Sequence, residues 1–237
     1  MKNFILAAGL LPLVCLRLDA QSFQNLAFEA ATLTPEQGDQ QWPNLVPITS
    51  ALPGWSAYLG DVEQTMVGQN TYANSVATVA VLGPGWGTGY GPFGVNTGII
   101  DGNYSALLQG GITPDSPASE YVSASIAQTG TVPGTAESLQ FKADGGDFSV
   151  SFAGNTLPTT LLATVTAPSG QLYGVFGIDI APYAGQTGQL EFTTSDYSSL
   201  LLDDIKFSTQ VVPEPAPIIL TAIGGLVLAL RRRFCKQ

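Results

Sequence analysis

Residues 121–128 read Tyr-Val-Ser-Ala-Ser-Ile-Ala-Gln, and their pattern indicates the fold class. Val122, Ala124 and Ile126 fall on one face of an extended chain, with serines between them, because side chains alternate along a strand. Such alternation is typical of a strand with one buried face. We therefore expect this stretch to pack against a hydrophobic core.

Seven further stretches share an enrichment in β-branched and aromatic residues and are separated by glycine, proline, asparagine and aspartate. These expected strands are residues 75–82, 138–142, 148–152, 160–166, 171–178, 189–193 and 200–207. No stretch of the central region has a convincing 3.6-residue apolar period, so little helix is expected. Many short strands with closely spaced turns predict an all-β fold, an antiparallel β-sandwich of the jelly-roll kind.

The N-terminus has the layout of a secretory signal peptide. Lys2 precedes an apolar run over residues 4–16. That run is shorter than the about 20 residues that a spanning helix needs. Ala20 offers a small residue at the expected cleavage site, so residues 1–20 are predicted to be the signal peptide. Cys15 is a candidate for lipidation, but the bulky Val14 before it disfavours that alternative.

The C-terminal segment, residues 210–237, combines three features in a fixed order. These are Pro213, Glu214 and Pro215, an apolar stretch over residues 216–230, and Arg231, Arg232 and Arg233. At about 1.5 Å per residue the apolar stretch is about 22 Å long, against a hydrocarbon core of about 30 Å. It predicts a short transmembrane helix, and snorkelling arginines can compensate for its length. The positive-inside rule leaves the arginines in the cytoplasm and residues 21–209 outside.

This tail resembles the PEP-CTERM sorting signal, which has a Pro-Glu-Pro motif, a short transmembrane segment and a basic end. In that family a membrane transpeptidase-like enzyme, the exosortase, recognises the tail and is thought to cut near the motif. Such proteins are typical of Gram-negative bacteria that make extracellular polysaccharide. The resemblance implies that residues 213–215 are recognised by the enzyme and that Arg231–Arg233 stop transfer. It also implies an intermediate anchored in the inner membrane and then a location at the cell surface or outside the cell.

Composition excludes several chemistries for the domain at residues 21–209. The chain has no histidine, which removes Ser-His-Asp and Cys-His nucleophiles and histidine metal sites. Its two cysteines, Cys15 and Cys235, fall in the end segments. We therefore expect neither a disulfide nor a thiol nucleophile in the domain.

A glycoside hydrolase needs only two carboxylates, so that class stays open. The candidate pairs are Asp61 with Glu63, on a strand-like stretch, and Asp144 with Asp147, in a Gly-rich turn. Because turns prefer aspartate and glycine for backbone reasons alone, we expect no catalytic activity. A small glycoside hydrolase is the second alternative.

The domain is strongly acidic. Lys142 and Lys206 are the only basic residues between Gln21 and Val212, against 16 acidic ones (all 18 except Asp19 and Glu214), a net charge of about −14. Nucleic acid would be repelled, because binding it needs a surface of lysine or arginine. Neutral glycans, cations and other proteins remain as partners, and acidity also keeps an exported protein soluble.

Residues 83–98 are rich in glycine and carry Trp86, Tyr90 and Phe93. Aromatic rings on such a loop are typical of lectin-like modules that stack sugars. The alternative is a long loop whose rings fold back onto the sandwich. A carbohydrate-binding module is therefore the first alternative function.

The two ends of the domain resemble those of jelly-roll carbohydrate-binding and galactose-binding-like modules. The residues that carry the resemblance are Asn25–Glu29, Leu52–Trp55, Tyr183–Phe192 and Leu200–Phe207. In those modules the first and last strands often hold a structural calcium ion. The resemblance implies a Ca²⁺ site formed by the carbonyl of Ala27 with Glu29 and Asp203.

The alternation of side chains along the last strand explains why Asp203 would need such a partner. It places Leu201, Asp203, Ile205 and Phe207 on one face of the last strand and Asp204 beside Lys206 on the other. A buried, unpaired carboxylate is costly, so Asp203 needs a cation, backbone N–H donors or a proton. Oxygen ligands suit Ca²⁺, and hydrogen bonds from the backbone are the alternative.

The expected function is that of a non-enzymatic, exported cell-surface or extracellular-matrix protein sorted through its tail. The expected partners are an exosortase-type enzyme and the membrane, with contact to exported polysaccharide left open.

Overall fold

The computed structural model describes residues 21–34, 44–72, 75–86, 98–113, 120–167 and 170–213. The expected signal peptide, and the expected tail beyond Pro213, lie outside the described residues, as do Tyr90 and Phe93. Within the described ranges, no helix has the length and apolar character needed to cross a membrane.

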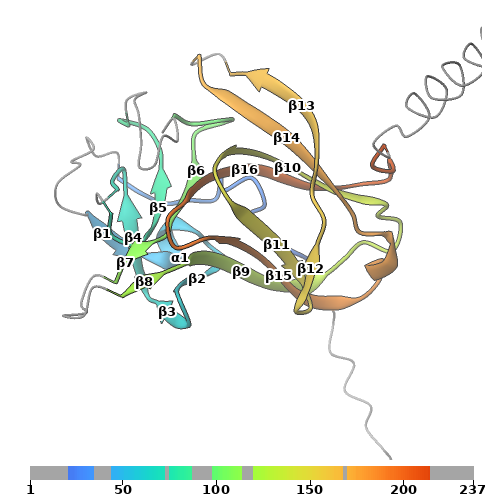
Figure 1. Ribbon diagram of the computed structural model, residues 1–237, viewed down its shortest axis with the longest axis horizontal. Helices are drawn as coiled ribbons and strands as arrows, with labels where there is room; N and C mark the ends of the chain where they lie inside the picture. Colours follow the sequence, from blue (N-terminus) through green and yellow to red (C-terminus); the bar gives the residue numbers. More distant parts are fainter. Residues whose placement is uncertain are drawn as a thin grey trace, which may run out of the picture.

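The described residues form a β-sandwich of two sheets (Figure 1). The larger has eight strands, in the order β1 (Leu45–Pro47), β4 (Met66–Gln69), β5 (Thr78–Leu82), β6 (Ser105–Gln109), β16 (Ser199–Ser208), β10 (Ser138–Gly145), β14 (Leu172–Asp179) and β13 (Thr160–Thr166). The smaller has six, in the order β12 (Asn155–Leu157), β11 (Phe148–Phe152), β15 (Thr187–Thr194), β9 (Ala124–Thr131), β2 (Ser56–Leu59) and β3 (Val62–Gln64).

The strands of both sheets pair antiparallel, apart from β4 and β5, which run parallel. A short ribbon of β7 (Gly111–Ile112) and β8 (Tyr121–Val122) lies beside them. The described helices are single turns, α1 (Ile48–Ala51) and the 3₁₀ helix η2 (Ala181–Tyr183). The expected all-β sandwich is therefore confirmed.

The hydrophobic core lies between the two sheets. Ala124 and Ile126 of β9 are fully buried in it, and Val122 packs against it, as their alternation predicts. Phe141 of β10 is central, since its ring lies 5.2 Å from the ring of Phe192 and 5.4 Å from that of Phe176. Aromatic pairs at such distances add to the stability that burial supplies.

Each of the eight expected stretches contains a strand, and β11 and β13 have the expected bounds. The strands without a sequence prediction include β6, which reads Ser-Ala-Leu-Leu-Gln and is buried throughout. Its outer face contributes Leu107 to a second cluster with Ile100 and Leu201, while Leu108 belongs to the main core. A strand buried on both faces shows no alternation of polar and apolar residues, so it has no period to detect.

The expected face of the last strand is wrong. Leu202 and Ile205 pack in the same core, whereas Leu201 belongs to the second cluster on the other face. The cause is a bulge in the pairing with β10, where Asp203 lies opposite Lys142 but Lys206 lies opposite Gln140. Asp204 sits in this bulge with a φ of 43°, in the left-handed region. The extra residue reverses the alternation beyond it.

Candidate functional site

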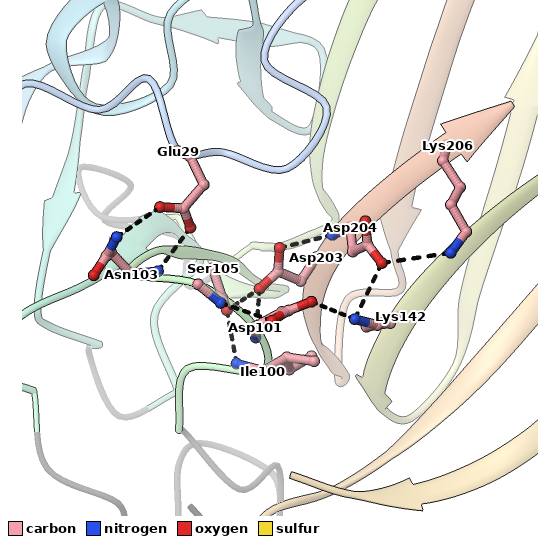
Figure 2. Close-up of polar contacts among 10 residues, drawn as sticks. Glu29, Ile100, Asp101, Asn103, Ser105, Lys142, Asp203, Asp204 and Lys206 are labelled. Carbon is pink, nitrogen blue, oxygen red and sulfur yellow. Dashed lines mark hydrogen bonds and ion pairs between the residues drawn. The ribbon is translucent and has the colours of Figure 1, made fainter. Parts of the chain in front are cut away.

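Residues 100–105, which lead into β6, are held by carboxylates from the two ends of the domain (Figure 2). On one side, Glu29 Oε1 accepts hydrogen bonds from the backbone N–H groups of Asn103 (2.7 Å) and Tyr104 (3.1 Å). Glu29 Oε2 accepts a third from the Asn103 side chain at 3.0 Å. Gly102 turns beneath this carboxylate with a φ of +58°, and a Cβ there would overlap Glu29.

On the other side, Asp203 holds the same loop from β16. Its side chain is 1% exposed. Oδ2 accepts hydrogen bonds from the Asp101 backbone N–H (3.0 Å) and the Ser105 hydroxyl (2.7 Å), and Oδ1 accepts one from the Asp204 N–H (2.7 Å). Burial raises the pKa of Asp203 to about 7, although these three donors oppose that rise. The carboxyl group therefore changes its protonation state near neutral pH.

Both lysines of the domain lie next to this point. Lys142 Nζ is 2.5 Å from Asp101 Oδ2 and 3.0 Å from Asp204 Oδ2, and Lys206 Nζ is 3.7 Å from the same Asp204 oxygen (Figure 2). The expected neighbourhood of Asp204 and Lys206 is confirmed. Lys142 lowers the pKa of Asp101 by its hydrogen bond. Burial lowers the pKa of Lys142, but its two carboxylate partners outweigh that effect and raise it.

The residues of the expected calcium site come to one region. Glu29 and Asp203 bind the same loop, and the carbonyl of Leu26, next to Ala27, accepts a hydrogen bond of 3.0 Å from the Ile205 N–H of β16. The first segment is thus attached to the last strand. In the part of the chain that the structure describes, no three Asp, Glu or Cys side chains cluster to hold a metal ion. The donors on Asp203 match the alternative left open above, and the calcium site stays a prediction.

Of the three expected sugar-binding rings, Trp86 lies in the described residues. It is half-buried and contacts Tyr72 edge-to-face, with ring centroids 6.1 Å apart. Both rings pack on the second cluster, on the outer face of the larger sheet. This is the fold-back arrangement for Trp86, and sugar binding by residues 86–93 remains a prediction.

A different aromatic pair is exposed, and no sequence pattern indicated it. Tyr121 begins β8 and Tyr197 lies in the turn between β15 and β16, yet their rings stack at 4.2 Å with planes 25° apart. They are 37% and 57% exposed. The hydrogen bond between the Tyr197 and Tyr121 side chains raises the pKa of Tyr197 to about 12. The Tyr197 hydroxyl therefore stays neutral at physiological pH, and phenolic hydroxyls can exchange hydrogen bonds with an uncharged ligand.

The two candidate carboxylate pairs for a glycoside hydrolase lie in turns or accept hydrogen bonds from neighbouring side chains. Asp61 lies in the turn between β2 and β3 rather than on a strand, and Glu63 accepts a hydrogen bond of 3.0 Å from the Ser56 hydroxyl. Asp147 lies in the β10–β11 turn, as expected. Asp144, at the end of β10, accepts a hydrogen bond of 3.4 Å from Gln171.

The described part of the sorting motif is Pro213, which lies past the end of β16. With Val211 and Val212 it lines a cavity of about 540 Å³, together with Glu137, Pro158, Thr160, Asp179 and Ala181. Val212 packs over Gly177 of β14. Glu214, Pro215 and the three arginines lie outside the described residues.

No protein-family model and no curated protein matches the chain. Among solved structures, a weak likeness exists to the enzymatically active domain of tailspike protein 4 from bacteriophage CBA120, with a TM-score of 0.31 and 13% identity over 76% of this chain and 21% of that one. The chain thus spans about a fifth of the length of that tailspike chain. A likeness this low carries no argument about fold or activity.

Proposed function

We propose that this chain is an exported cell-surface or extracellular-matrix protein without catalytic activity, sorted by a C-terminal tail of the PEP-CTERM kind. The observation that carries the proposal is the order of Pro213, Glu214 and Pro215, an apolar stretch and three arginines. β16 ends at Ser208, Pro213 follows five positions later, and Val211 between them is 69% exposed. A motif so close to an exposed segment suits access by a membrane-bound processing enzyme.

The start of the folded body supports removal of a signal peptide after Ala20. The carbonyl of Gln21 accepts a hydrogen bond of 2.9 Å from the Thr131 N–H, and Ser22 forms a bridge with Thr131. Cleavage after residue 20 therefore keeps this first contact of the described body. We further propose that the sandwich is a jelly roll, in line with the resemblance of its first and last segments to carbohydrate-binding modules.

The surroundings of the carboxylates favour a non-catalytic role. Glu29 and Asp203 hold a loop, and Asp101 and Asp204 pair with Lys142. The candidate glycosidase carboxylates lie in turns or accept hydrogen bonds from neighbouring side chains. The contacts of Glu29, Asp101, Asp203 and Asp204 explain their positions without a substrate.

Sorting can be tested by expressing the full chain in a bacterium that carries an exosortase-type enzyme. We expect mass spectrometry to find an extracellular form that begins at Gln21 and ends near Pro215. Replacing Pro213, Glu214 and Pro215 by alanine should leave the protein in the inner membrane, as should deletion of the enzyme. Pro158→Ala, which changes a proline that lines the same cavity, is the control and should be processed normally. Export and cleavage that ignore both the motif and the enzyme would contradict the proposal.

Contact with exported polysaccharide is the second candidate function, and the exposed Tyr121–Tyr197 pair favours it. Flat, neutral rings with hydroxyl groups suit an uncharged, hydroxyl-rich ligand, and the domain's charge of about −14 disfavours an anionic one. Retention on the producing bacterium's polysaccharide should weaken about tenfold or more in Tyr197→Ala, which corresponds to one lost stacking contact. Trp86→Ala separates the two aromatic sites. If only that variant loses retention, the loop at residues 83–98 is the binding site, and if neither does, the polysaccharide contact is wrong.

A further inference from the structure

The four edge strands of the two described sheets differ in how they discourage pairing with another chain. An open edge presents a row of backbone N–H and C=O groups, and natural proteins block such edges with proline, charge or short length. β1 is three residues long and ends in Pro47, and β3 carries Glu63. β12 is also three residues long.

β13 has neither proline, nor charge, nor short length to protect it, and its pairing with β14 is irregular at only one bulge. It is seven residues long, reads Thr-Leu-Leu-Ala-Thr-Val-Thr, and contains neither a charge nor a proline. The bulge lies between Leu161 and Ala163, so Ala163–Thr166 form a regular run with β14. β13 is the last strand of the larger sheet, at the margin opposite β1 (Figure 1). Among the described residues, none pairs with its outer side.

β13 lies in a stretch of the sequence that contains no charged residue. Residues 148–178 contain no Asp, Glu, Lys or Arg, although the domain as a whole has a net charge of about −14. This stretch includes β13 and all of its neighbour β14 except the last residue, Asp179. Leu161 on β13 and Leu172 on β14 are each 56% exposed. An open edge and exposed leucines thus occur together in a stretch without charge. Residues 64–100 are also uncharged, but the edge strand on that side of the sheet, β1, is three residues long and ends in Pro47.

We propose that β13 is a self-association edge, which pairs antiparallel with β13 of a second copy of this chain across a two-fold axis. Two copies repel each other over most of their acidic surface, and residues 148–178 give them a neutral approach. An antiparallel pair of identical strands is self-complementary, as a two-fold interface requires. Glu137 and Asp179 lie near the Thr160 end of β13, but the regular run Ala163–Thr166 contains no carboxylate for a basic partner to bind, so a second copy fits this edge better. The pairing joins the two larger sheets into one.

The test uses the full chain with its tail, in a neutral detergent, so that association through the tail is equal in all variants. Sedimentation equilibrium over a range of concentrations should show a dimer that dissociates on dilution. Leu161→Lys removes an exposed apolar contact, and Thr164→Lys places like charges near each other across the two-fold axis. Each should weaken dimerisation about tenfold or more. Because each added lysine lowers the net negative charge, repulsion over the whole surface would change in the opposite direction.

The matched control is Val62→Lys on β3, which makes the same charge change at an exposed edge position. Val62 is 64% exposed, and this variant should dimerise like the natural protein. A monomer at every concentration would overturn the proposal, as would a dimer that Leu161→Lys and Thr164→Lys leave unchanged or that Val62→Lys weakens equally. Should the β13 variants fail to fold, hydrogen exchange of the unaltered protein decides. Amides of Ala163–Thr166 must gain protection as concentration rises, and an absence of that gain refutes the pairing.

Discussion

Stability of the domain should fall as pH rises from 5 to 8, because of one buried carboxyl group. Asp203 is 1% exposed, and burial raises its pKa from the ordinary value of 3.8 to about 7. A raised pKa means that the folded state binds the proton more tightly than the unfolded state does. The stabilisation is therefore complete below pH 4 and is lost as pH rises through 7.

The size of the effect follows from the two pKa values. The difference between 3.8 and about 7 corresponds to about 4 kcal/mol in total. Part of this is lost below pH 5, so the change in unfolding free energy between pH 5 and pH 8 is about 2 to 3 kcal/mol. That is a large fraction of the stability of an ordinary domain.

Few other side chains of this protein titrate between pH 5 and pH 8. The chain has no histidine, the residue whose ordinary pKa lies in this range. The lowered pKa of Asp101 acts below pH 4, and the raised pKa of Lys142 acts above pH 10. A slope between pH 5 and pH 8 therefore reports mainly on Asp203.

The assay is urea unfolding of residues 21–213 at several pH values, followed by circular dichroism and by tryptophan fluorescence, to which the buried Trp55 contributes. The natural protein should lose stability steadily, whereas Asp203→Asn should show an almost flat profile, since its amide cannot titrate. Asp204→Asn, which leaves Asp203 in place, should keep the slope. Stability that is constant or rises with pH in the natural protein, or an equal slope in Asp203→Asn, would refute the argument.

Three further predictions concern the same loop. Gly102→Ala should lower stability by about 1 to 3 kcal/mol, because its φ of +58° and its closeness to Glu29 leave no room for a methyl group, whereas Gly134→Ala, with nothing within 4 Å, should cost less than about 0.5 kcal/mol in chemical unfolding. Lys142→Met should lower the free energy of unfolding by about 1 to 2 kcal/mol, because Asp101 and Asp204 lose the positive charge with which both of them pair. If high salt abolishes this loss of stability, the ion pairs act only as screened surface charges. The calcium prediction expects CaCl₂ to raise the melting temperature of the natural protein and not of Asp203→Ala, and identical melting curves with and without CaCl₂ would contradict it.

Sequence patterns predicted the strands that have one buried face. The alternation in β9 placed Ala124 and Ile126 in the core, and β13 has the bounds that its composition indicated. β6 escaped because both of its faces are buried, so its sequence has no period. β4 escaped because it is short and its neighbour β5 pairs parallel to it, without a hairpin turn to mark the connection.

The candidate site was predictable only in part, for reasons of geometry. Apolar neighbours indicated that Asp203 is buried, and it is, but a bulge turned the following residues to the other face. Aspartate tolerates the left-handed conformation better than most residues, so Asp204 is a reasonable bulge position, although nothing in the local pattern requires one. Two of the three donors to Asp203 come from Asp101 and Ser105, about 100 positions away, and a contact at that separation leaves no trace in a single sequence.

The two proposals, sorting by the tail and pairing through β13, reinforce each other physically. Copies anchored in one membrane have a high effective concentration, so a weak edge contact is enough to join them. Removal of the tail ends that confinement, and a contact that depends on one short strand then dissociates on dilution unless the extracellular concentration stays high. The acidic charge works in the same direction, since it opposes close contact of two copies except along uncharged stretches such as residues 148–178. An uncharged edge that is also long and free of proline therefore favours association through β13, while Pro47 and Glu63 block two of the other edges.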